Sequence, residues 1–177
     1  MSRTMNMQAY IRTVNAVSQT VGVIAAGMIV IAVAITCQMI FIRYFLNGST
    51  IWQTEAVIYL MVGATLLGLP YVQKLKGHVN VDLVPMLLPP VARKLLMIAS
   101  YLAAVAILAV MTYHGWELVH ISYARGWVSE TVWGPPLWIP YLAMPIGFGL
   151  FTLQLLADLF ETLQTPAEDI IIEGSGH

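Results

Sequence analysis

Residues 95–113 read LLMIASYLAAVAILAVMTY, a run without a charged residue that is apolar on every face of a helix. A bilayer with a hydrocarbon core of about 30 Å requires roughly 20 such residues in each spanning helix. A strand of a membrane barrel would instead alternate in polarity over about ten residues. The run therefore predicts a transmembrane helix.

Three further windows lack Lys, Arg, Asp and Glu, namely residues 13–42, 56–73 and 131–157. Only 10% of the chain is charged and 59% is hydrophobic, whereas soluble domains carry about 25% charged residues. The first window is too long for a secretory signal core, so it is expected to persist as a helix. We predict an all-α membrane protein, a single domain over residues 1–164, with transmembrane helices at about 18–42, 53–73, 93–114 and 136–160.

Short amphipathic interfacial helices are expected beside these spans. Residues 77–90 (GHVNVDLVPMLLPP) mix polar and apolar side chains and are too short to cross the bilayer, so we expect them at the headgroups. The first 16 residues fit a similar surface helix, with Tyr10 and Val14 among the side chains facing lipid. Residues 165–177 are expected to form a mobile cytoplasmic tail.

The basic residues predict the orientation. Arg3, Arg12 and four basic residues between the second and third spans face Arg43 and Arg125 on the opposite side. By the positive-inside rule, both termini are cytoplasmic. Tryptophans near the predicted outer ends agree, since indoles settle at the membrane interface. They are Trp52, Trp116, Trp127, Trp133 and Trp138.

Several functional classes fit poorly. The formal net charge of -1 offers no basis for binding nucleic acid. The single cysteine, Cys37, cannot form an internal disulfide. A haem anchor needs facing imidazoles from two helices within the bilayer, and the four histidines offer no such opposing pair. His114, Glu117 and His120 are spaced around a helix rather than on one face, which disfavours zinc.

A self-sufficient four-span transporter working as a homodimer remains an alternative. Such a protein needs ionisable groups near the midplane, and Glu55, the acidic candidate, lies at a helix end. Arg43 closes the first span at a similar depth, so the two either pair or each extend to water. Small residues in the later spans favour close helix contacts, within the chain or with another subunit. These include Gly63, Ala64, Gly68, Ala99, Ala103, Ala104, Gly147 and Gly149.

The order of motifs in residues 43–94 resembles the small membrane subunit of tripartite ATP-independent periplasmic (TRAP) transporters. The first span is followed by RYFLNGSTIWQTE, then a span with GATLLGLP, then KLKGHVNVDLVPMLLPPVARK. One departure is Thr54, since an acidic pair often follows the tryptophan in that family. The matching positions are the structural or interface candidates Arg43, Asn47, Trp52, Glu55, His78, Asp82 and Arg93.

The resemblance implies a non-catalytic scaffold subunit, not an enzyme, in the bacterial inner membrane. Its expected partners are a large transmembrane subunit, a periplasmic substrate-binding protein and membrane lipids. The large subunit would perform sodium-coupled, elevator-type uptake of an organic acid that the periplasmic protein delivers. No metal or cofactor is expected in this chain, and sodium ions would bind to the large subunit. His78 and Asp82 would orient the interfacial segment through hydrogen bonds.

Overall fold

The computed structural model describes residues 2–75 and 89–166, with side chains from Gln8 onward. Helix α1 spans Ser2–Phe41 and continues into a π-helical turn, η1 (Ile42–Leu46). Helix α2 spans Ile51–Lys74 and α4 spans Pro90–Ala124. A short α5 (Trp138–Tyr141) precedes α6 (Ala143–Gln164).

Four segments of the described chain are long and apolar enough to cross a membrane: Gln8–Leu46, Ile51–Lys74, Pro90–Ala124 and Trp138–Gln164. The described residues form no strand, and their sole β-bridge joins Val128 to Pro136. The predicted all-α class with four spanning helices is confirmed.

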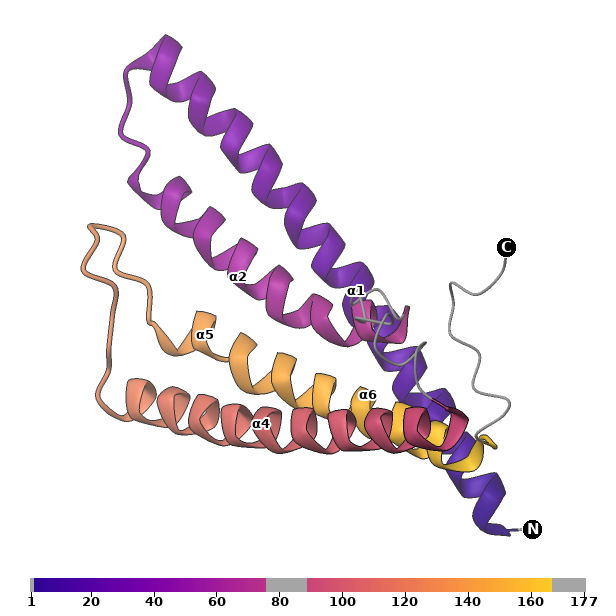
Figure 1. Cartoon of the computed structure of the whole chain (residues 1–177). Coiled ribbons are helices and arrows are strands. Elements are labelled where there is room, and N and C mark those ends of the chain that lie inside the picture. The colour runs from indigo at the N-terminus through magenta and orange to yellow at the C-terminus, as the bar shows by residue number, and fades with distance from the viewer. Residues whose placement is uncertain (1, 76–88, 167–177) are drawn as a thin grey trace.

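The helices form two antiparallel hairpins (Figure 1). Helix α1 packs along α2, and α4 packs along α6. Helix α2 also packs against α6, so α2 and α6 lie in the centre while α1 and α4 lie outside. We call the side with residues 42–50 and 125–137 the loop end, and the side with the start of α1 and the end of α6 the terminal end.

The helices are longer than the expected spans. Residues 2–16 do not form a separate surface helix, because α1 is continuous from Ser2 and has no proline or glycine before Gly22. Val14, expected to face lipid, is buried. Tyr10 donates a hydrogen bond to the Leu153 carbonyl at 3.1 Å, so this part of α1 packs on α6.

Close helix contacts depend on small residues in α2 and α6. Gly63 and Gly147 are buried, and a Cβ at Gly147 would lie 2.5 Å from the Leu66 carbonyl oxygen. Pro70, four residues after Leu66, has no N–H to bond that carbonyl. The backbone of α6 therefore lies directly over an acceptor that α2 leaves open, and only glycine fits there.

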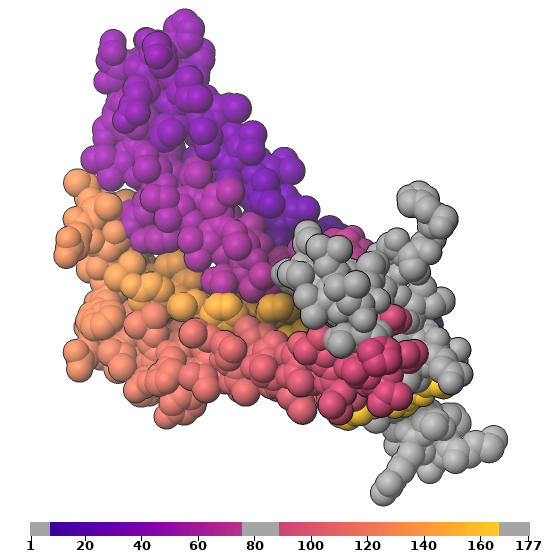
Figure 2. Space-filling model, viewed as in Figure 1, coloured from indigo at the N-terminus to yellow at the C-terminus, as the bar shows by residue number. Residues whose placement is uncertain are grey.

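The small residues of α4 behave differently. Ala99 and Ala103 are exposed, and Leu108 is the sole buried residue of α4 before Gly115. The broad lower surface in the space-filling view belongs to α4 (Figure 2). This helix contributes a large apolar face that the rest of the described chain does not cover.

Candidate functional site: polar clusters at both ends of the helices

The loop end is held by a buried carboxylate in the first turns of α2. Glu55 is 7% exposed. The Tyr59 hydroxyl, one turn later, donates a hydrogen bond to one carboxylate oxygen at 2.5 Å. The Thr131 hydroxyl donates to the other oxygen. Glu55 thus ties α2 to the loop between α4 and α5 through bonds that are stronger than neutral ones.

The loop that supplies Thr131 folds back on itself. The Ser129 N–H bonds the Pro135 carbonyl, and the Leu137 N–H bonds the Trp127 carbonyl, each at 3.0 Å. Gly134 has φ +56°, in the left-handed region that favours glycine, and it lies between the two arms. This hairpin presents Thr131 to Glu55.

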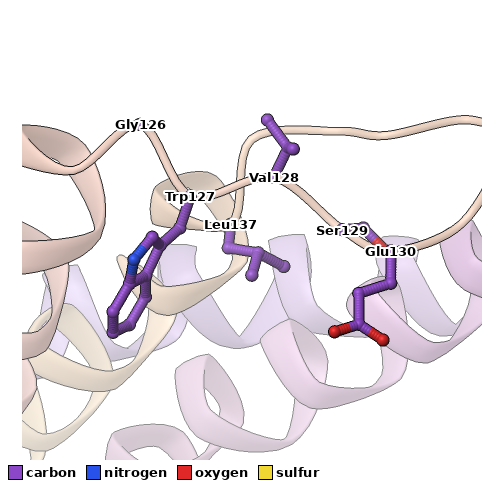
Figure 3. Close-up of a pocket in the computed structure, with 6 residues that line it drawn as sticks. All are labelled: Gly126, Trp127, Val128, Ser129, Glu130 and Leu137. Carbon is purple, nitrogen blue, oxygen red and sulfur yellow. The ribbon is translucent and has the colours of Figure 1, made fainter.

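The same loop borders an open surface pocket (Figure 3). Its lining residues are Gly126, Trp127, Val128, Ser129, Glu130 and Leu137. The side chains of Trp127, Glu130 and Leu137 extend to one side of the loop, whereas Val128 points to the other. The Arg125 guanidinium lies 5.9 Å from the centre of the Trp127 ring, a distance typical of a cation–π contact.

Aromatic pairs extend the loop-end contact. Trp52 of α2 packs edge-to-face on Trp133 of the loop, with ring centres 6.4 Å apart. Tyr123 of α4 packs on Trp138 of α5 at 5.8 Å. Trp52, an interface candidate from the sequence, therefore reinforces the connection that Glu55 makes.

Arg43 and Asn47 lie at the end of the first helix, before the chain turns into α2 at Ile51. Arg43 is an exposed residue of η1. Asn47 ends that turn with φ +46°, and its N–H bonds the Ile42 carbonyl. The ion-pair contact found within residues 2–75 and 89–166 joins His114 to Glu117 and does not involve Arg43. The structure brings Glu55 together with Tyr59 and Thr131 rather than with Arg43.

The terminal end contains a second polar cluster, which joins three helices. Ser18 of α1 donates to the Gln154 side-chain oxygen at 2.8 Å. The Gln154 amide donates to Asn15 at 3.0 Å and to Asp158 at 3.2 Å. Gln73 of α2 donates to the second Asp158 oxygen at 2.7 Å. Gln154 is 1% exposed, and it holds α1 and α6 together.

Sequence reasoning missed this cluster. Amide side chains at 73 and 154 within uncharged windows, with an acidic residue at 158, were the available signal. Such residues in a spanning helix need hydrogen-bond partners, but their spacing in the sequence does not identify the partners.

Basic residues add further contacts at this end. The Lys94 ammonium donates to the carbonyls of Leu163 and Thr165 at 3.2 and 2.7 Å, which satisfies open acceptors at the end of α6. The Lys74 ammonium donates to the Gln19 side chain at 2.9 Å. Arg93 lies in the first turn of α4, where its N–H bonds the Pro89 carbonyl at 3.0 Å.

The other two interface candidates, His78 and Asp82, lie outside the described residues, as does most of the expected interfacial segment 77–90. Their role in orienting that segment stays a prediction.

Comparison with known proteins agrees with the motif order. Residues 32–165 match the family model of the DctQ component of tripartite ATP-independent periplasmic transporters. The matched region contains α2, α4, α5 and α6 in full and the last part of α1 with η1. The resemblance in residues 43–94 is therefore confirmed over a much longer stretch.

Two curated relatives share this region. The chain is 23% identical over 143 residues to the C4-dicarboxylate TRAP transporter small permease protein DctQ of Vibrio cholerae, covering 69% of this chain and 62% of the relative. It is 25% identical over 141 residues to the isethionate TRAP transporter permease protein DctMQ of Oleidesulfovibrio alaskensis, covering 77% of this chain and 22% of the relative. The chain thus spans less than two thirds of the length of either relative. With its four membrane helices and the match over residues 32–165, the chain belongs to the DctQ family of small membrane components of TRAP transporters.

Proposed function

We propose that this chain is a non-catalytic scaffold subunit, which braces a large membrane subunit in the bacterial inner membrane. The count of basic residues on the two sides supports cytoplasmic termini. The terminal end then faces the cytoplasm, and the loop end faces the periplasm.

Internal hydrogen bonding supports a bracing role. Glu55 ties α2 to the 125–137 loop, and Gln154 and Asp158 tie α6 to α1 and α2. Both ends of the helix assembly are therefore cross-linked by polar contacts. A unit held at both ends suits a rigid support better than a moving carrier.

The exposed small-residue face of α4 is the observation that carries the proposal. Ala99 and Ala103 are one turn apart and exposed, so both lie on an open stripe of α4. Small residues at this spacing allow a second helix to approach closely within a membrane. In α2 and α6 the corresponding residues, Gly63 and Gly147, are already covered within the chain. We therefore assign the α4 stripe to a helix of the large subunit.

The DctMQ relative supports a large partner. The matched stretch makes up 22% of that protein, so more than three quarters of its length lies outside the part shared with this chain. A region like this one is thus joined there to a much longer membrane permease. We propose that the corresponding large subunit binds this chain, and that it carries the substrate and sodium ions by an elevator-type movement.

Substrate class follows from the same relatives. One is named for C4-dicarboxylates and the other for isethionate, both small organic anions. We propose that the complex takes up a small organic acid, delivered by a periplasmic binding protein. The chemistry of substrate binding would reside in those partners.

Co-purification with a large TRAP subunit from the same organism tests the proposal. Ala103→Phe places a bulky ring on the α4 stripe and should lower recovery of the large subunit at least fivefold. Ala34→Phe is the matched control, since Ala34 is an exposed alanine of α1, and it should leave recovery unchanged. Loss of the chain should abolish transport.

Normal uptake by the large subunit in the absence of this chain would contradict the bracing role. Ligand flux into liposomes that contain this chain alone would favour the self-sufficient transporter instead.

A further inference from the structure

The α1–α2 hairpin and the α4–α6 hairpin meet over only part of their length. Figure 1 shows them running obliquely to one another and converging toward the terminal end. Gly147 of α6 lies against Leu66 where the two central helices cross, and Gln73 bonds Asp158 farther toward the terminal end. Among the described residues, the backbone of α4 comes near neither α1 nor α2. The first turns of α2 therefore lie beyond the crossing, on its loop-end side.

The loop of residues 125–137 bridges the two hairpins beyond this crossing, and we call it the strap. It connects α4 to α5 and so belongs to the α4–α6 hairpin, yet its Thr131 hydroxyl donates to Glu55 of α2. Two residues later in the strap, Trp133 packs edge-to-face on Trp52, with ring centres 6.4 Å apart. The strap thus fastens the α4–α6 hairpin to the start of α2.

The strap is stiff rather than loose. Val128 and Pro136 form a β-bridge across it, and the Leu137 N–H bonds the Trp127 carbonyl at 3.0 Å. Pro135 and Pro136 fix two φ angles in its returning arm. A stiff strap holds its tip at a defined place relative to α4, so the contact at its tip also places α2.

The fastening point lies far enough from the crossing to control an angle. Glu55 precedes Leu66 by eleven residues, which is about 16 Å along a helix. A displacement of about 3 Å at Glu55 then corresponds to a rotation of about 10° about the crossing. The contact farthest from a pivot restrains rotation most, and this contact is the one that the strap makes.

The chemistry of the fastening allows it to be reversible. Both described partners of the Glu55 carboxylate, Tyr59 and Thr131, are neutral hydroxyls. Water can replace the Thr131 hydroxyl as a donor once the strap moves away, so release leaves no carboxylate oxygen without a partner.

We propose that the strap sets the angle between the two hairpins, with the bond from Thr131 to Glu55 as its fastening. While the bond is made, the α1–α2 hairpin is held at one angle to α4. When it is broken, the α1–α2 hairpin pivots about the contact of Gly147 with Leu66, which acts as a hinge. This inference rests on contacts within the chain and does not depend on the bracing role.

Distance measurements between pairs of spin labels test the proposal. The purified full chain in detergent is labelled at the natural Cys37 of α1 and at Trp116→Cys of α4, both exposed positions toward the loop end. A second pair, Val17→Cys and Leu95→Cys in a Cys37→Ser background, reports on the terminal end. Pulsed dipolar spectroscopy gives the distribution of distances for each pair. Without further substitution, both pairs should give one narrow distribution.

Thr131→Val removes the hydroxyl at almost constant volume and should make the distribution for positions 37 and 116 about twice as broad. A rotation of about 10° moves residue 37 by about 3 Å, which this method resolves. The pair at 17 and 95 should not change, because the polar cluster of the terminal end is intact. Thr131→Ser keeps a hydroxyl and should keep the narrow distribution. Glu130→Gln changes the neighbouring exposed carboxylate and is the matched control.

Two results would overturn the proposal. An unchanged distribution for positions 37 and 116, in Thr131→Val and also in the double variant with Trp133→Ala, would show that the strap does not set the angle. Equal broadening of both label pairs would show a general loss of packing instead of a pivot. Glu55→Gln replaces Thr131→Val if the latter does not fold.

Discussion

Gly147 of α6 lies against the carbonyl oxygen of Leu66 in α2, so closely that a Cβ on Gly147 would be 2.5 Å from that oxygen. Pro70 creates this acceptor, because a proline cannot donate to the carbonyl four residues before it. The contact joins the two central helices, and through them the two hairpins. A proline in one helix and a glycine in another thus form one packing unit.

Replacing Gly147 by alanine should destabilise this unit. The added methyl group meets backbone, which cannot rotate away, and overpacking of this kind costs about 1–3 kcal/mol. Thermal unfolding of the purified chain in detergent should show a lower midpoint. Gly149→Ala is the control, since its nearest contact, a Thr112 methyl, is 3.8 Å from the added Cβ. Equal midpoints for the two variants would refute the packing argument.

The Glu55–Thr131 contact should prove energetically coupled. Glu55→Gln and Thr131→Val each remove part of this charge-assisted interaction, so each should lower the midpoint of thermal unfolding. The double variant should be less destabilised than the sum of the singles, as unfolding measurements would show. Glu130→Gln, an exposed carboxylate on the same loop, should leave stability unchanged. Strict additivity would show that the two side chains do not interact.

Gln154 should matter most among the polar residues of the terminal end. Gln154→Leu removes the partners of Ser18 and Asn15 and leaves buried polar atoms unpaired, at a cost of about 1–3 kcal/mol. Limited proteolysis should then cut the N-terminal part of α1 faster. Gln19→Leu is the control, because Gln19 is exposed and its described contact is with Lys74. An unchanged cleavage rate for Gln154→Leu would argue that α1 is held by apolar contacts alone.

Reversing the charge of Arg43 should not compensate for reversing the charge of Glu55. Glu55→Arg places a cation against the Tyr59 and Thr131 hydroxyls, whereas Arg43→Glu changes an exposed residue. The double variant should assemble no better than Glu55→Arg alone, as judged by recovery of the large subunit. Rescue in the double variant would show that the two charges pair after all.

Alanine at His78 or Asp82 should alter assembly or stability and leave the pH profile of transport unchanged. The reason is that hydrogen bonds, rather than proton transfer, are expected to position the interfacial segment. Transport assays across a range of pH, combined with recovery of the complex, would separate the two roles. A shifted pH profile would point to proton chemistry.

The hydrophobic pattern predicted the helices and their number, because burial in a bilayer requires long uncharged runs and that requirement is local. It did not predict helix lengths, since α1 continues to Ser2 and α4 to Ala124 wherever no residue breaks them. The motif order around Arg43, Trp52 and Glu55 identified the family, but not the partner of Glu55.

The sequence by itself thus determined the fold class, the four membrane helices and the family, all of which depend on composition and order along the chain. Only the tertiary structure decided that Glu55 bonds Thr131, that Gln154 joins α1 to α6, and that Gly147 covers the Leu66 carbonyl. Glu55 and Thr131 are 76 residues apart in the sequence, and Ser18 and Gln154 are 136 apart. Leu66 and Gly147 are 81 residues apart. Hydrogen-bond and packing partners at such separations depend on how helices cross, and helix periodicity carries no information about crossing.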